Sequence, residues 1–179
     1  MASLVDRMIA AAKLQPELYD EVERDPNAMG QAMTVVVIAS VAAGIGNMGF
    51  AGPLGLIGGS IAALIGWLVW AVLIHFVGTA LLAQPGQRVE LGQVLRVIGF
   101  SAAPGVIRVV AFIPVLGGLI SLAAWIWMLA AMVVAVRQVF RYQSTGRAVL
   151  VCIIGWFVQL LIVALFMMIG LGGAFMLAA

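Results

Sequence analysis

Residues 148–169 read AVLVCIIGWFVQLLIVALFMMI, a long run that contains no charged side chain. A helix needs about 20 mostly apolar residues to cross the hydrocarbon core of a bilayer, and this run reaches that length. Apolar and polar residues do not alternate in it, as they would over about ten positions in an outer-membrane strand. Because backbone polar groups in hydrocarbon need partners within the protein, the run predicts a transmembrane α-helix.

The rest of the chain has the same apolar character. Of its 179 residues, 65% are hydrophobic and 9% are charged, whereas a soluble domain carries roughly 25% charged residues. Four further apolar segments, separated by glycine, proline or polar turns, predict spans over 28–47, 56–84, 99–112 and 119–139. The third of these is interrupted by Pro104-Gly105. We therefore expect an all-α fold, a polytopic membrane protein with about five transmembrane helices.

Two regions outside the predicted spans are amphipathic. At the N-terminus, Ser3 followed by Asp6 predicts the start of a short helix, and Pro16 suits the first turn of a second one. In the first helix an apolar face lies opposite Asp6, Arg7 and Lys13, and it is formed by Leu4, Val5, Met8, Ile9 and Ala12. We expect these two helices to lie on the membrane surface or to fold against the loops. Residues 88–98, RVELGQVLRVI, predict an interfacial helix before the third span.

Positive charge is gathered on one side of the predicted membrane. The N-terminus, the loop between the second and third spans and the loop between the fourth and fifth spans hold every basic residue except Arg108. Basic loops face the cytoplasm, so we expect a multi-pass inner-membrane protein with its N-terminus inside and its C-terminus outside. The chain then divides into a cytoplasmic N-terminal segment, 1–26, and a five-helix transmembrane domain, 27–179. A net charge of +2 is too small to indicate nucleic-acid binding.

Arg108 lies inside the third predicted span, four residues after Pro104. A charged side chain at the centre of a span costs about 2.5–3.5 kcal/mol on insertion scales. Two interpretations remain open. Either the guanidinium faces a polar cavity or a lipid headgroup, or the span is short and tilted and the side chain extends to the cytoplasmic interface.

Four other arginines are candidates for binding anionic lipid headgroups or a partner protein at the cytoplasmic face: Arg96, Arg137, Arg141 and Arg147. Close to an anionic leaflet, each basic residue contributes about 1 kcal/mol. The last three can instead pair with the acidic residues of 17–23 and hold the N-terminal helices over the loops, or they can serve only to set the topology.

His75 is the only histidine and lies in the second predicted span. It is a candidate ligand for a haem or a pigment, or a hydrogen-bond partner for a neighbouring helix. In the same span Gly58, Ala62 and Gly66 recur at four-residue spacing, which predicts close helix packing within the chain or between copies. Tryptophans near the span ends predict interfacial anchors.

A catalytic set is missing from the sequence. There is one histidine and one cysteine, and the acidic residues are confined to positions 6–25 and Glu90. These residues cannot form a Ser-His-Asp or Cys-His site or an ordinary zinc site, and no phosphate-binding loop is present. We expect a protein that is not an enzyme and holds no cofactor.

Several stretches carry a family resemblance. They are AAKLQPELYDEVERDP before the first span, GWLVWAVLIHFVGT in the second, RVIGFSAAPGVIRVV in the third and MVVAVRQVFRYQSTGRAVLVCIIGW across the last loop. The chain resembles bacterial members of the Yip-one family, the Ypt-interacting protein family. The resemblance implies five transmembrane helices and a cytoplasmic N-terminus. Eukaryotic relatives are Golgi and vesicle membrane proteins that associate with prenylated small GTPases, but their DLYGP-type segment has no counterpart here.

Three hypotheses for the function follow. The first is a non-catalytic membrane scaffold or accessory protein that organises the bilayer or docks partners on its cytoplasmic face. The second is a small-molecule or lipid permease centred on Arg108 and the helix break at Pro104. The third is a haem- or pigment-binding membrane subunit that uses His75. The expected partners are the lipid bilayer with its anionic headgroups and a membrane protein or a second copy of the chain.

Overall fold

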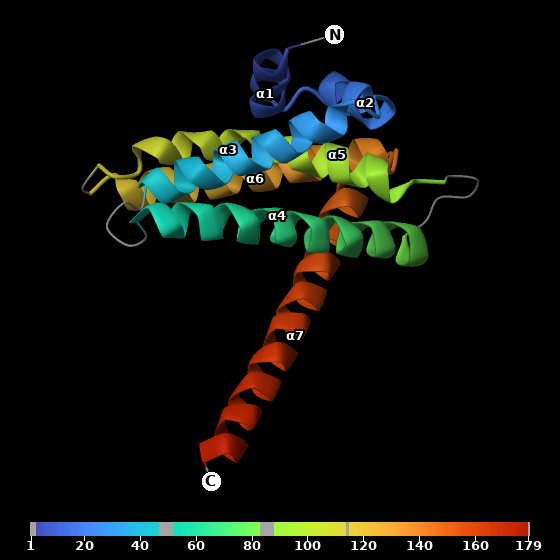
Figure 1. Cartoon of the computed structure of the whole chain (residues 1–179). Coiled ribbons are helices and arrows are strands. Elements are labelled where there is room, and N and C mark those ends of the chain that lie inside the picture. Colours follow the sequence, from blue (N-terminus) through green and yellow to red (C-terminus); the bar gives the residue numbers. More distant parts are fainter. Residues whose placement is uncertain (1–2, 47–51, 83–87, 114, 179) are drawn as a thin grey trace.

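The computed structural model describes residues 3–46, 52–82, 88–113 and 115–178 of the chain (Figure 1). Every regular element in these ranges is a helix, and five helical segments are long and apolar enough to cross a membrane. This confirms the predicted fold class. The elements are α1 (Leu4–Ala12), α2 (Pro16–Arg24), α3 (Ala28–Gly46), α4 (Gly52–Phe76), the π-helix η1 (Val77–Leu81), α5 (Leu91–Ser101), the 3-10 helix η2 (Ala103–Val110), α6 (Gly117–Val139) and α7 (Thr145–Ala178).

Four of the spans lie side by side, and successive ones run in opposite directions: α3, α4, α5 with η2, and α6 (Figure 1). Small side chains bring α3 close to its neighbours, because its buried positions recur every three or four residues at Ala28, Ala32, Val35, Ala39 and Ala42. Gly99 of α5 lies against Ala32, where an added Cβ would be 2.8 Å from the alanine Cβ. The predicted break after this contact is confirmed, since α5 ends at Ser101 and the 3-10 helix with Pro104 follows.

The third span begins earlier than the sequence predicts. Residues 88–98 were expected at the interface, yet α5 starts at Leu91, and the candidate span runs from Leu91 to Val110. The physical reason is that α2, and not lipid headgroups, covers the polar face of this segment. The guanidinium of Arg96 is buried against the backbone of α2, so its charge does not prevent the helix from packing inside the protein.

The N-terminal helices pack against the spans as well as near the loops. The predicted start signals are confirmed: the Ser3 hydroxyl accepts from the Asp6 amide at 3.1 Å, and Pro16 opens α2. However, α1 lies against η2 and α5, while α2 lies against α5 and α6 (Figure 1). Leu4 and Met8 pack against the core, as the apolar face of α1 predicts, but Arg7 is buried and Val5 and Ile9 are exposed, which is the opposite of the prediction for these three residues.

α7 is longer than the apolar run that predicts it, because the helix continues to Ala178. Its 34 residues correspond to about 51 Å at about 1.5 Å per residue, well beyond a hydrocarbon core of about 30 Å. Figure 1 shows α7 crossing α4 and then running away from the other spans. At the crossing, a Cβ on Gly155 would lie 3.0 Å from Cδ1 of Ile74 and 3.4 Å from the ring of Trp70.

The close packing predicted for the small residues of α4 is wrong within this chain. A Cβ added at Gly58, Gly59 or Gly66 would meet no atom of the described residues within 4 Å. Close approach occurs instead at glycines of other helices, such as Gly99 and Gly155, because the neighbouring helices cross at those positions. The second helix begins earlier than predicted, because α4 starts at Gly52 and the sequence predicts a turn that continues to residue 55. Residues 47–51 lie outside the described ranges.

Candidate functional site

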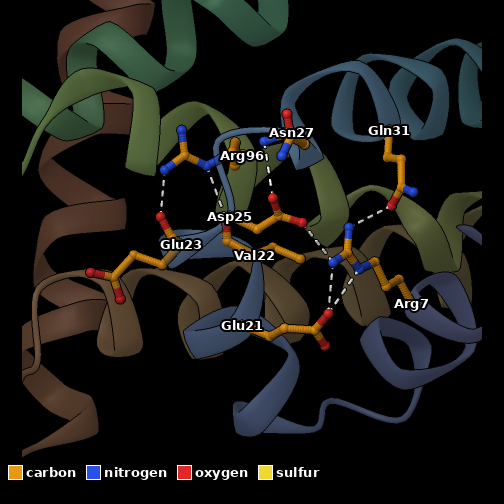
Figure 2. A network of polar contacts seen from close by, with 8 residues as sticks. All are labelled: Arg7, Glu21, Val22, Glu23, Asp25, Asn27, Gln31 and Arg96. Carbon is orange, nitrogen blue, oxygen red and sulfur yellow. Dashed lines mark hydrogen bonds and ion pairs between the residues drawn. The ribbon is translucent and has the colours of Figure 1, made fainter. Parts of the chain in front are cut away.

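A polar network joins the N-terminal helices to the spans (Figure 2). At its centre is Arg7 of α1, whose side chain is 4% exposed. Its Nη2 donates to Glu21 Oε1 at 2.7 Å and to Asp25 Oδ2 at 2.8 Å, and its Nη1 donates to Gln31 Oε1 of α3 at 2.7 Å. One guanidinium therefore holds α1, the end of α2 and the start of α3 together.

The carboxylates of this region have perturbed pKa values for opposite reasons. The hydrogen bond from Arg7 lowers the pKa of Asp25, with a further contribution from the Asn27 amide. Burial raises the pKa of Glu23, and the nearby Arg141 offsets this only in part. Burial also raises the pKa of Tyr19, whose side chain is enclosed beneath α2.

Arg96 is part of the same assembly and faces inward (Figure 2). It donates from Nε to the carbonyl of Val22 at 2.9 Å and from Nη2 to the carbonyl of Glu23. These carbonyls belong to the last turn of α2, where helix carbonyls lack intrahelical partners and attract cations. Gln93, one turn earlier on α5, donates to Glu23 Oε1 at 3.2 Å. The geometry thus gives Arg96 a structural role in docking α2.

The remaining candidate arginines lie at or beside the turn between α6 and α7. Nη2 of Arg141 is 3.5 Å from Glu23 Oε2, which is one of the pairings expected between this turn and the N-terminal acids. Arg137 donates to the carbonyls of Tyr142 and Gln143 at 3.3 and 3.5 Å and so closes the turn on itself. Arg147 is exposed.

The exposed polar side chains of α2 and of this turn form a surface that we call the polar face. Its members are Glu17, Glu21, Arg24, Arg137, Arg141, Gln143, Ser144, Thr145 and Arg147. A further contact holds the turn: the Tyr142 hydroxyl shares its one O–H between the carbonyls of Leu82, the C-cap of the π-helix η1, and Gly78, near the start of η1, at 3.2 and 3.4 Å. The polar face is therefore built on backbone that tertiary contacts hold in place.

Arg108 lies elsewhere. Its carbonyl packs beside Gly46, the last residue of α3, so it stands at the end of the spans away from the polar face. Its side-chain contacts lie within the bundle and do not reach the end of the spans that carries the basic loops, so the structure does not favour extension of the side chain to that interface. Instead the side chain turns into the bundle, where Nε donates to the Gly105 carbonyl at 3.3 Å and Nη2 lies 3.6 Å from the sulfur of Met128.

The half-buried Arg108 lines a cavity of about 330 Å³. Four of the five tryptophans contribute to its wall: Trp67, Trp70, Trp125 and Trp156. Two of them donate to other helices, Trp67 to the Leu95 carbonyl at 3.1 Å and Trp70 to the sulfur of Met132 at 2.9 Å. The prediction of interfacial anchoring is therefore wrong for Trp67 and Trp70, because the indole N–H groups of these two residues find partners inside the protein.

His75 lies in the last turn of α4. Its Nδ1 is buried and finds no hydrogen-bond partner in the described part of the chain, so this nitrogen does not make the expected bond to a neighbouring helix. Within the same ranges, no group of three or more histidine, cysteine, aspartate or glutamate side chains is placed to hold a metal ion. Cys152 is a half-buried residue of α7.

Sequence reasoning missed Arg7 and assigned it to the outer face of α1 with Asp6 and Lys13. The available signal was the acidic stretch that follows at 17–25, which offers a buried cation several partners.

Comparison with known proteins places this helical arrangement in a family. The model of the Yip1 domain family matches residues 15–167, which include α2, all five candidate spans and the turn between α6 and α7. No curated protein and no solved structure matches the chain. The match covers most of the sequence and the helical architecture agrees with it, so the chain belongs to the Yip1 domain family.

Proposed function

We propose that this membrane protein is a non-catalytic accessory protein that docks a partner on its polar face. The observation that carries the proposal is the construction of that face. Arg7, Arg96 and Arg141 fix α2 to three other parts of the chain, while the side chains around them stay exposed. A backbone that is already held in place, with polar side chains exposed on it, lowers the entropic cost of binding a partner.

The polar face carries both signs of charge. Glu17 and Glu21 of α2 are exposed, as are Arg137 and Arg147 at the turn. Complementary charge steers association and selects the partner, so we expect a partner surface that presents acidic side chains opposite the turn and basic ones opposite α2. The expected side of the membrane is the cytoplasmic one, because the basic loops lie there.

A photo-crosslinking experiment in the source membrane tests the proposal. A crosslinking side chain is placed at Glu17, at Arg147, or at Leu119 at the opposite end of α6. We expect adducts of one discrete mass from the first two positions and no such adduct from Leu119. Charge reversal by Arg147→Glu should reduce the adduct formed at position 17. Equal adducts from all three positions, or none from the polar face, would contradict docking there.

A second candidate function, transport of a small molecule or lipid, is favoured by one observation. The helix break at Pro104 and the charge of Arg108 meet at a cavity, and discontinuous helices line the binding sites of known transporters. Flux or lipid-transfer assays with the parent chain and Arg108→Ala test it. The candidate fails if both behave like empty liposomes.

A further inference from the structure

The cavity beside Arg108 has the size and composition of a ligand site. Its volume of about 330 Å³ lies within the range of about 300–1,000 Å³ typical of ligand pockets. Apart from the guanidinium and the Ser101 hydroxyl, its side chains are aliphatic, aromatic or thioether groups from α3, α4, α5, α6 and α7. Such a wall accepts a hydrocarbon chain and offers almost nothing to a polar molecule.

The charge at one end of the cavity is not neutralised by the protein. In the described ranges Arg108 forms no ion pair, and its acceptors are one backbone carbonyl and one thioether sulfur. A thioether is a weak acceptor, and a guanidinium has five N–H donors. Several donors of this half-buried cation are thus left for a ligand.

The backbone next to Arg108 leaves space for the guanidinium. At Gly105, an added Cβ would lie 2.9 Å from Nη2 of Arg108 and 2.8 Å from the sulfur of Met128. Any larger residue would push one of them aside. The side chain is therefore held toward the cavity and does not extend along the outside of η2.

We propose that this cavity binds one anionic glycerophospholipid from the bilayer, with the lipid phosphate at Arg108 and an acyl chain along the tryptophan wall. A guanidinium fork matches the geometry of phosphate oxygens. The occupant is a lipid and not a soluble anion because the walls next to the charge are apolar and the spans around them are membrane helices. The lipid belongs to the leaflet at the Gly46 end of α3, and its binding does not depend on docking at the polar face.

Fluorescence quenching by brominated lipids tests the proposal directly, because bromine in an acyl chain quenches tryptophans that it touches. The full chain is reconstituted into vesicles of phosphatidylcholine that contain a small fraction of acyl-brominated phosphatidylglycerol or, separately, acyl-brominated phosphatidylcholine. We expect quenching at about fivefold lower fraction for the anionic lipid, since a basic residue near an anionic headgroup is worth about 1 kcal/mol.

Three variants and one competitor make the result specific to Arg108. Arg108→Gln should abolish the preference, Arg108→Lys should keep part of it, and Lys13→Gln, which removes an exposed cation of the N-terminal segment, should leave it intact. Inorganic phosphate at equal ionic strength should not release the quenching. A preference that survives in Arg108→Gln, or an equal loss in Lys13→Gln, would overturn the proposal. Release by inorganic phosphate would identify a soluble-anion site and reject the lipid. The preserved preference in Arg108→Lys shows that the protein still folds when this side chain changes.

Discussion

Single side chains decide how the N-terminal helices attach, and Arg7 is the clearest case. Three acceptors from two other helical regions, Glu21, Asp25 and Gln31, converge on one buried guanidinium. The charge is tolerated in the interior because two of these partners are carboxylates. Removing this arginine destabilises the folded protein, because it leaves the carboxylates around it without a compensating charge.

Replacing Arg7 with methionine should therefore loosen α1 without unfolding the spans. Glu21 is 46% exposed and can rehydrate, so we expect a loss of about 2 kcal/mol, less than the roughly 3–5 kcal/mol for a fully buried pair and within the range for a hydrogen-bonding group left without its partner. Backbone amides of α1 should then exchange hydrogen about thirtyfold faster at neutral pH. The matched control is Lys13→Met, which removes an exposed cation of the same segment and should leave exchange unchanged.

The same variant should change the response to acid. Arg7 lowers the pKa of Asp25 in the folded protein. A lowered pKa stabilises the folded state above the ordinary pKa of the carboxyl, and that contribution is lost as the pH falls through the lowered pKa. In the parent chain, exchange of α1 should therefore accelerate below the ordinary pKa of an aspartate, while in Arg7→Met this part of the acid dependence should disappear. Equal exchange of the two proteins at neutral pH would contradict the structural role of Arg7.

The burial and the contacts of single side chains were the hardest features to predict from the sequence. Hydrophobic periodicity assumes that water surrounds a helix, so it places Val5 and Ile9 inside and Arg7 outside. The structure leaves Val5 61% and Ile9 48% exposed and buries Arg7. The rule fails for Arg7 because the groups that surround its guanidinium come from α2, its C-cap and α3, which the pattern of one helix does not reveal. Arg108 was recognised as unusual, but the cavity beside it depends on contacts between helices distant in sequence.

At the scale of elements, the prediction was more successful because apolar length is a local property. All five spans were found, and the proline break ends α5 where the missing N–H of Pro104 requires it. The start of the third span was missed because residues 88–98 read as amphipathic. The polar side chains that make this segment amphipathic are Gln93 and Arg96, and both face α2 and not the membrane surface. A pattern of polar residues cannot tell which neighbour will cover it.

The crossing of α4 and α7 gives a prediction at this scale. Gly155 is the point of contact, and a leucine there would overlap Ile74 and Trp70. Overpacking of this kind costs about 1–3 kcal/mol, so Gly155→Leu should lower the free energy of unfolding by that amount in mixed detergent micelles. Gly58→Leu is the matched control, because a Cβ at Gly58 meets nothing within 4 Å. If both variants lose the same stability, α7 does not rest on α4 at Gly155.

For the whole molecule, polar and charged groups gather at one end of the spans. The acids and bases of α2 meet the turn between α6 and α7 there, whereas Arg108 stands near the other end. The gathering of charge at one end was predictable from the positions of the basic residues, but the contacts that these residues make there were not. Arg96 was expected to bind headgroups or a partner protein, whereas the structure uses it to dock α2. Pairing of Arg141 with an N-terminal acid was one of the expected alternatives, and Glu23 is that acid.

The same asymmetry of charge predicts the orientation of the molecule in the membrane, which can be measured with single cysteines. In a background with Cys152→Ala, a cysteine is placed at exposed Ser144 in the turn after α6, or at Gly118 in its first turn. Gly118 tolerates the change because an added Cβ meets nothing within 4 Å. The 23 residues of α6 rise by about 35 Å, enough to separate the two positions by a bilayer. Because basic segments stay in the cytoplasm, a membrane-impermeant maleimide should label position 118 in intact cells and position 144 only in inverted vesicles. The reverse pattern would invert the molecule and move the polar face outside, and labelling of both positions from one side would mean that α6 does not cross the membrane.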